Sequence, residues 1–233
     1  MRDGRYLILV VILFIIGAVI GWTLNSLYVQ SQTAAVSGLV TGVGGGPGAS
    51  TEPQENSVLS NFREQANSLL REHTVLAGEY VEKILDSEDP AVIKASIDKN
   101  SKSIADMMGN IYGGSASAQF LSLWNDQILE FSNYAKAVRS NNSSGKSSAM
   151  SSLDSIASNI QNTVNNLDSS NTAARMGEMM REHIALILSL ADAYQVHNQP
   201  LVSQYESSAF DQAGNFADYI VQASVTAKPQ MFK

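Results

Sequence analysis

Two of the three histidines in this chain follow Arg and Glu in the same order, each within a long apolar stretch. The stretches are LLREHTVLA at 69–77 and MMREHIALI at 179–187, and His73 and His183 hold the same place in them. Neutral imidazole is the commonest metal ligand among protein side chains, and it also transfers protons. Glu72 and Glu182 directly precede the two histidines, and two histidines with one such glutamate would make an open metal site. The candidate metal ligands are therefore His73, His183, Glu72 and Glu182.

A polar residue stands at a third equivalent position, because Gln127 lies almost midway along the chain between His73 and His183. Around all three positions, apolar residues recur at alternating steps of four and three, which places them on one helical face. Asn100 and Gln212 interrupt comparable apolar stripes in two of the segments that follow. If the helices pack about a shared axis, these five side chains meet in the core. We call them the polar layer: His73, Asn100, Gln127, His183 and Gln212.

A buried imidazole or amide without a partner costs about 1–3 kcal/mol, so the polar layer needs an explanation. One interpretation is that its groups hydrogen-bond to one another and fix the register of the helices, as a buried Asn does in coiled coils. The others are a site for a transition-metal ion and a site for a small organic ligand. Met176, Met179 and Met180 precede His183 on the same helix, and thioethers with imidazole suit Cu(I). Methionines at this spacing also commonly fill gaps in a core.

Other chemistry has less support in the sequence. The chain has no cysteine, which excludes disulfides, Cys-ligated zinc and thiol catalysis. The histidines do not follow the spacing of H-E-x-x-H or of di-iron Glu-x-x-His pairs. No combination of Ser, His and acid predicts a nucleophile, and His197 is expected in a solvated turn. We therefore expect a protein that is not an enzyme.

The residues that would position the polar layer follow a helical period from about residue 59 onward. Pro90 and Pro200 follow His73 and His183 at the same interval, and Gly145 follows Gln127 at nearly that interval, so each long helix ends at an equivalent place. We predict an all-α fold of six helices, arranged as three antiparallel hairpins at about 59–112, 115–168 and 171–225. The segment at 143–167 is the weakest helix, because Ser and Asn compete for backbone hydrogen bonds.

The N-terminus predicts a membrane anchor. Residues 7–24 carry no charge and, as a helix, would span roughly 27 Å, close to the hydrocarbon thickness of a bilayer. Arg2 and Arg5 precede this segment and the first charge after it is Glu52, so residues 1–6 are expected in the cytoplasm and the rest outside. A cleaved signal peptide is the alternative, although its only small-residue site, near Ala35, lies far beyond the apolar run.

Residues 25–58 are expected to form a flexible linker, since most of them are Gly, Ser, Pro and other small or polar residues. The helical bundle is then expected to occupy residues 59–226. The net charge of −7 and the scattered basic residues argue against a nucleic-acid partner. The expected partners are the lipid bilayer, through residues 7–24, and another protein.

These features predict a membrane-tethered, exported bundle that acts as a binding or structural subunit of a membrane-associated assembly, such as an envelope or virion. The alternative is a metal-binding or metal-handling protein that uses His73 and His183. The segments LLREHTVLAGEYVEKIL, MMREHIALILSLADAY and YESSAFDQAGNFADYIV resemble a little-characterised repeat-helical family of bacteria and large DNA viruses. Its members repeat an acidic-His dipeptide on successive helices. Here Gln127 stands where that pattern implies a histidine, and the resemblance implies the fold rather than an activity.

Overall fold

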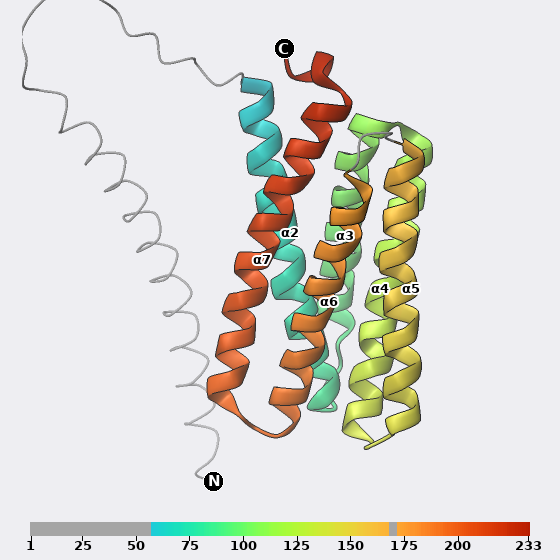
Figure 1. The fold of residues 1–233 in the computed structure, drawn as a ribbon. Helices are drawn as coiled ribbons and strands as arrows, with labels where there is room; N and C mark the ends of the chain where they lie inside the picture. Colours follow the sequence, from blue (N-terminus) through green and yellow to red (C-terminus); the bar gives the residue numbers. More distant parts are fainter. Residues whose placement is uncertain (1–56, 168–171) are drawn as a thin grey trace, which may run out of the picture. The chain divides into compact units, whose positions relative to one another are not determined.

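The structure, a computed structural model, describes residues 57–167 and 172–233. In these residues it shows six α-helices packed as a bundle in which helices adjacent along the chain run antiparallel (Figure 1), which confirms the predicted all-α fold. The elements are α2 (Ser57–Leu85), α3 (Ala91–Tyr112), α4 (Gly114–Arg139), α5 (Ser143–Leu167), α6 (Ala173–Gln195), α7 (Gln199–Ala227) and the short 3-10 helix η1 (Pro229–Phe232). The predicted tail and anchor, and the linker up to residue 56, lie outside the described residues. Within those residues, no helix combines the length and apolar character that a bilayer crossing needs.

The helices divide into an inner set and an outer set. The inner helices α2, α4 and α6 all pack against one another. The outer helices lie in the grooves between them: α3 contacts α2 and α4, α5 contacts α4 and α6, and α7 contacts α6 and α2. The ring is closed, because the last helix, α7, packs against the first, α2 (Figure 1). This arrangement brings the three inner helices, with their repeated sequence, to the centre of the bundle.

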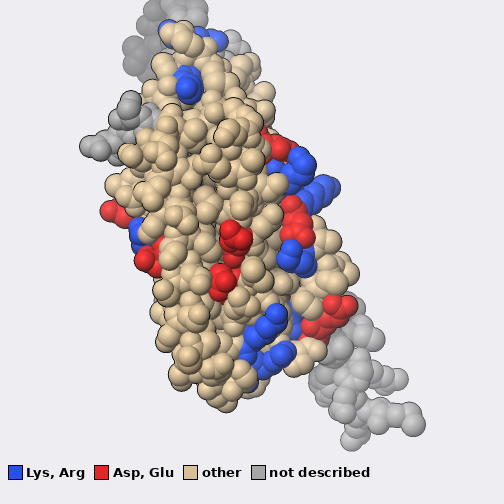
Figure 2. Space-filling model, turned by 90° about the vertical axis from the view of Figure 1, so that its right-hand side faces the viewer, with Lys and Arg blue, Asp and Glu red and all other residues tan. Residues whose placement is uncertain are grey.

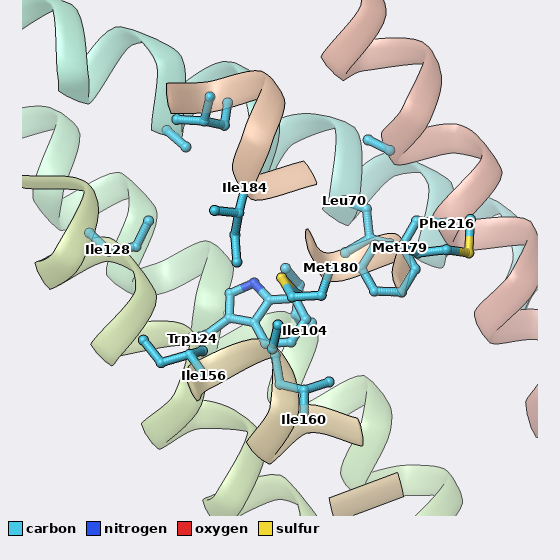
Figure 3. Close-up of a cluster of buried hydrophobic side chains, with 14 of the residues drawn as sticks. Leu70, Ile104, Trp124, Ile128, Ile156, Ile160, Met179, Met180, Ile184 and Phe216 are labelled. Carbon is cyan, nitrogen blue, oxygen red and sulfur yellow. The ribbon is translucent and has the colours of Figure 1, made fainter. Parts of the chain in front are cut away.

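The core is built by all six helices, since each has an apolar stripe that follows the helical period. Figure 3 shows one part of it, where Trp124 of α4 lies among Met180 and Ile184 of α6 and Ile104 of α3. Ile156 and Ile160 of α5, Leu70 of α2 and Phe216 of α7 also belong to this cluster. The polar layer therefore has to fit into a densely packed apolar interior.

Each inner helix ends in the same kind of turn. The residue after the helix cap has a positive φ at all three ends: Ser87 (61°), Asn141 (52°) and His197 (54°). The next amide then donates to the carbonyl that closes a Schellman motif; these bonds are Glu88 N to Lys83 O, Asn142 N to Ala137 O and Asn198 N to Ala193 O. The three positive-φ residues follow His73, Gln127 and His183 at one and the same interval. The repeat thus extends from the sequence to the backbone conformation.

These turns lead to a prediction for stability. Replacing the exposed His197 by glycine should raise the free energy of unfolding by about 0.5–1 kcal/mol, because a left-handed conformation strains a residue with a Cβ but not glycine. Asn141→Gly is the matched control and should change stability less, since Asn adopts this conformation more readily. Urea unfolding of the two full-length variants measures the difference. A loss of stability in His197→Gly, or equal gains in both variants, would contradict this explanation.

One local prediction is confirmed and two details differ from the sequence prediction. Helix α5 forms over its full predicted length despite its Ser and Asn content, because Leu153, Ile156 and Ile160 are buried against the bundle. Met150, which the sequence pattern places on the apolar stripe of this helix, is 51% exposed, and Ala149 is buried in its place. The bundle also continues past residue 226, since η1 follows α7 and its Phe232 packs against Phe62 of α2 with the ring centres 5.4 Å apart.

Candidate functional site

The three equivalent inner-helix positions meet in the centre of the bundle. His73 of α2 and His183 of α6 lie with their ring centres 5.9 Å apart. Gln127 of α4 donates from Nε2 to the Met180 sulfur of α6 at 3.1 Å. Trp124 of α4 closes the third side, because its indole lies edge-on to His73 at 5.9 Å between ring centres. The side chains that the sequence aligns by their spacing are therefore neighbours in space, and all are buried.

The two outer-helix members of the polar layer are bonded to equivalent backbone atoms. Asn100 of α3 donates from Nδ2 to the carbonyl of Leu69 at 3.0 Å, and Gln212 of α7 donates from Nε2 to the carbonyl of Met179 at 2.8 Å. Each of these carbonyls lies one helical turn before a histidine, so the first and third repeats share one hydrogen-bond pattern. The middle repeat has the apolar Ile156 and Ala157 of α5 in the corresponding place.

Asn100 also determines which nitrogen of His73 carries its hydrogen. The Nδ2 group of Asn100 donates both to Leu69 O and to the Glu72 carboxylate, at 2.9 Å for the latter, so its Oδ1 is the acceptor of the amide. The 3.1 Å contact between that Oδ1 and His73 Nδ1 then requires hydrogen on Nδ1. The other ring nitrogen, Nε2, then carries no hydrogen and has a free lone pair inside the core.

Several polar atoms around the two rings have no hydrogen-bond partner among the described residues. They are His73 Nε2, His183 Nε2, Trp124 Nε1 and Gln127 Oε1. A cavity of about 10 Å³ lies beside them and is lined by both histidines, Trp124 and Met180. Such a volume is near the smallest that accommodates one water molecule. The cavity is therefore large enough for a single atom or one water molecule.

Both imidazoles are neutral at physiological pH. Burial lowers the pKa of His73 to about 4, although the Asn100 and Gln127 side chains partly oppose this shift. The Gln127 side chain raises the pKa of His73. His73 Nε2 and Gln127 Oε1 nevertheless have no hydrogen-bond partner among the described residues. Burial, with a smaller contribution from the charge of His73, lowers the pKa of His183 to about 3. Neutral rings can accept hydrogen bonds or bind metals.

The predicted carboxylate ligands do not join the histidines in the core. Glu72 and Glu182 are exposed, because a residue directly before a buried helical position is rotated by about 100° from it. Glu72 reaches the layer only indirectly, through its hydrogen bond with Asn100. Among residues 57–167 and 172–233, no three His, Asp or Glu side chains are placed to hold a metal together.

The repeated Arg-Glu-His sequence places its three side chains in three directions. The histidines point to the bundle axis and the glutamates outward. The arginines reach the outer helix on the other side: the Arg71 guanidinium lies 4.6 Å from the ring centre of Phe210 on α7, and Arg181 binds Asp154 and Ser158 on α5. On both α2 and α6, the histidine therefore packs toward the bundle axis while the arginine contacts a neighbouring outer helix.

Sequence reasoning misses two components of the site. It identifies Trp124 only as an apolar stripe residue, although the indole N–H faces the polar layer without a partner among the described residues. Met180 is one of three candidate thioethers, and of Met176, Met179 and Met180 it is the one that lines the cavity with both histidines. The signal for Trp124 is its position one helical turn before Gln127, which places both on one helical face.

Searches for a related family model, curated protein or solved structure gave no match to this chain.

Proposed function

We infer that this protein is a single-pass, membrane-tethered and exported bundle that serves as a non-enzymatic binding or structural subunit of a membrane-associated assembly. The observation that carries the inference is the uncharged run at 7–24, with Arg2 and Arg5 before it. The described helices are amphipathic and bury one face within the bundle, whereas this run is apolar on all sides. A helix of that kind requires lipid or a large protein interior around it.

The proposed organisation is a short cytoplasmic tail (1–6), an anchor (7–24), a linker that precedes α2, and three helical hairpins. Helix α2 begins at the same end of the bundle at which the chain ends, while the turns after α2, α4 and α6 lie at the opposite end (Figure 1). The acidic-His dipeptides support a proposed membership of the repeat-helical family named above.

One side of the bundle supports a role in assembly. Helix α5 carries only Lys146 and Asp154 as charged residues, and its exposed positions are otherwise mostly Ser and Asn. Figure 2 shows the side of the molecule on which α5 lies, where charges of both signs are scattered over a largely uncharged surface. Copies of a chain with a net charge of −7 repel one another, and a face with few charges is where that repulsion is smallest. We propose this face as the contact with the assembly.

The closed interior supports a function other than catalysis. The side chains of the polar layer are buried, and the space of about 10 Å³ beside them admits no organic substrate. The histidines, which would be the natural proton-transfer groups, are 2% and 4% exposed. A binding function would then belong to the surface of the bundle.

The membrane tether is tested with the full-length chain expressed in bacteria. We expect it in the membrane fraction after washing with high salt and alkaline carbonate, and an enzyme reporter that works only after export should be active when fused at Lys233. Ile15→Arg should move the protein to the soluble fraction, because an arginine at the centre of a bilayer span costs about 2.5–3.5 kcal/mol. Ile15→Leu is the matched control. A reporter active only in the cytoplasm, or a wild-type chain released by salt, would refute the tether.

The assembly contact is tested in the same membranes. A photoreactive residue at the exposed Ser155 of α5 should give a discrete cross-linked product. The same residue at Val92 of α3, which is 78% exposed, is the control and should give none. Equal yields at both positions, or no product at Ser155, would contradict the proposed face.

A further inference from the structure

The cavity that both core histidines line has the size of a binding site for one atom. His73 Nε2 and His183 Nε2 are buried without a partner among the described residues, and both side chains line the cavity. Its volume of about 10 Å³ excludes an organic ligand. Leaving buried polar atoms unpaired costs about 1–3 kcal/mol each. An occupant bound to both nitrogens would remove that cost.

His73 is oriented as a metal ligand is. Its Nδ1–H is held by Asn100 Oδ1, and Asn100 is in turn held by the Glu72 carboxylate. Metal-binding histidines nearly always donate their other N–H to a carbonyl or carboxylate, which fixes the tautomer and makes the free nitrogen more basic. Here the chain of contacts from Glu72 to the ring also brings negative charge toward the site, which would partly balance a bound cation.

The donor atoms select the kind of metal. The side chains of His73, His183 and Met180 line the cavity and offer imidazole nitrogen and thioether sulfur as ligands, while Glu72 and Glu182 are exposed. Zn²⁺ usually takes four ligands with thiolates or carboxylates among them, and Mg²⁺ and Ca²⁺ take oxygen ligands. Cu(I) takes soft thioether ligands together with imidazole, and brings only one positive charge into the core. An atom bound at about 2.0 Å to one nitrogen of each ring would hold the ring centres about 6 Å apart, and the observed separation is 5.9 Å.

We propose that His73 Nε2, His183 Nε2 and Met180 Sδ bind a single Cu(I) ion in the centre of the bundle. The Gln127 amide, which already donates to the Met180 sulfur, would remain as an outer partner because a thioether has two lone pairs. Of the methionines before His183, the structure assigns this role to Met180 alone. The inference goes beyond the proposed tethering function and does not depend on it.

The burial of the site determines how the experiment is done. Because both rings are almost fully buried, an ion can enter only when α2 and α6 separate, so the full-length chain is incubated with metal for hours in detergent. Ag(I) serves as a redox-stable probe of the same soft coordination, and Cu(I) is added anaerobically with ascorbate in competition with a chromogenic chelator. Native mass spectrometry counts the bound ions. We expect one equivalent of either ion and a rise in the melting temperature, with no stoichiometric binding of Zn²⁺.

Three variants locate the ion. His183→Leu should weaken binding by about 100-fold or more, a larger effect than the loss of an outer-shell partner. His197→Leu, which alters the exposed histidine, should bind as the wild type does. Met180→Leu preserves the packing and keeps the protein folded, and it should weaken Cu(I) binding about tenfold while leaving one weak site. Long-range ¹H–¹⁵N spectra of the wild type should show the Nε2 resonances of two histidines, and not the third, shift on adding Ag(I).

Each result decides the proposal even if His183→Leu does not fold. One equivalent bound, with shifted Nε2 resonances and weaker binding in Met180→Leu, would establish the site. A folded wild type that binds no Ag(I) or Cu(I) would overturn it, and the cavity would then hold a water that donates to His73 Nε2 and accepts from Trp124 Nε1–H. Binding that Met180→Leu leaves unchanged, or that His197→Leu abolishes, would overturn it as well.

Discussion

Acidification from pH 6.5 to about pH 4 should destabilise the protein by several kcal/mol through its two core histidines. In the unfolded chain both rings take up a proton near pH 6.5. In the folded protein burial lowers the pKa of His73 to about 4 and that of His183 to about 3. The unfolded state therefore binds more protons throughout this interval, and each histidine removes about 1.4 kcal/mol of stability for every pH unit. Above about pH 7.5 neither ring contributes appreciably to the pH dependence, because the unfolded chain no longer binds the protons.

The measurement is urea unfolding of the full-length chain at half-unit steps from pH 7.5 to 5, with a chelator present so that bound metal does not hold the rings neutral. Replacing both histidines by glutamine, the residue that the middle repeat already uses at this position, should remove most of the slope between pH 6.5 and 5. His197→Gln should keep it, because that ring is exposed in the folded state as well. If the double variant and the wild type lost stability in parallel, other groups would be responsible for the pH dependence.

Asn100→Leu should be the most damaging single change in the polar layer, with a loss of about 3 kcal/mol. The substitution removes the acceptor of His73 Nδ1 and the donor to Leu69 O and Glu72. A buried group deprived of its partner costs more than the net gain of the original bond, because the desolvation of that group is no longer offset. Gln212→Leu removes a bond to one backbone carbonyl only, and it should cost about 1 kcal/mol.

A double-mutant cycle separates this explanation from simple loss of packing. His73→Leu combined with Asn100→Leu removes both partners and should recover about 1–2 kcal/mol relative to the sum of the single variants. The free energies of unfolding of the four proteins, measured at pH 7.5, give the coupling directly. Additive losses would mean that Asn100 does not act through His73, and the argument for the fixed tautomer would fail with it.

Much of the fold could be predicted because each helix repeats one pattern. The recurrence of apolar residues at steps of three and four identifies the helices, and the near-equal intervals between repeats relate His73, Gln127 and His183 before any coordinates are known. The same intervals also relate the positive-φ residues of the three turns, which had no glycine to reveal them. What recurs in the sequence at a regular interval recurs in space when equivalent helices pack in equivalent ways.

The remainder depends on the rotation of individual helices, which the sequence defines only to within one position. On α5, steps of three and four admit either Ala149 or Met150 on the buried face, and packing selects Ala149. Glu72 and Glu182 are candidate ligands from their place directly before the histidines, and in the structure both are exposed. The partners of Asn100 and Gln212 are backbone carbonyls, which every residue possesses, so no sequence signal marks them.

The closed ring of helices has a consequence for cooperativity. In an open array of helical repeats, the terminal units have one neighbour each and can fray independently of the rest. Here α7 contacts α2, and every outer helix bridges two inner ones, so no repeat is terminal. Releasing any one of them would expose the imidazoles, the indole and the amides at the centre to solvent and break contacts on both sides. The bundle is therefore built to unfold all at once rather than unit by unit.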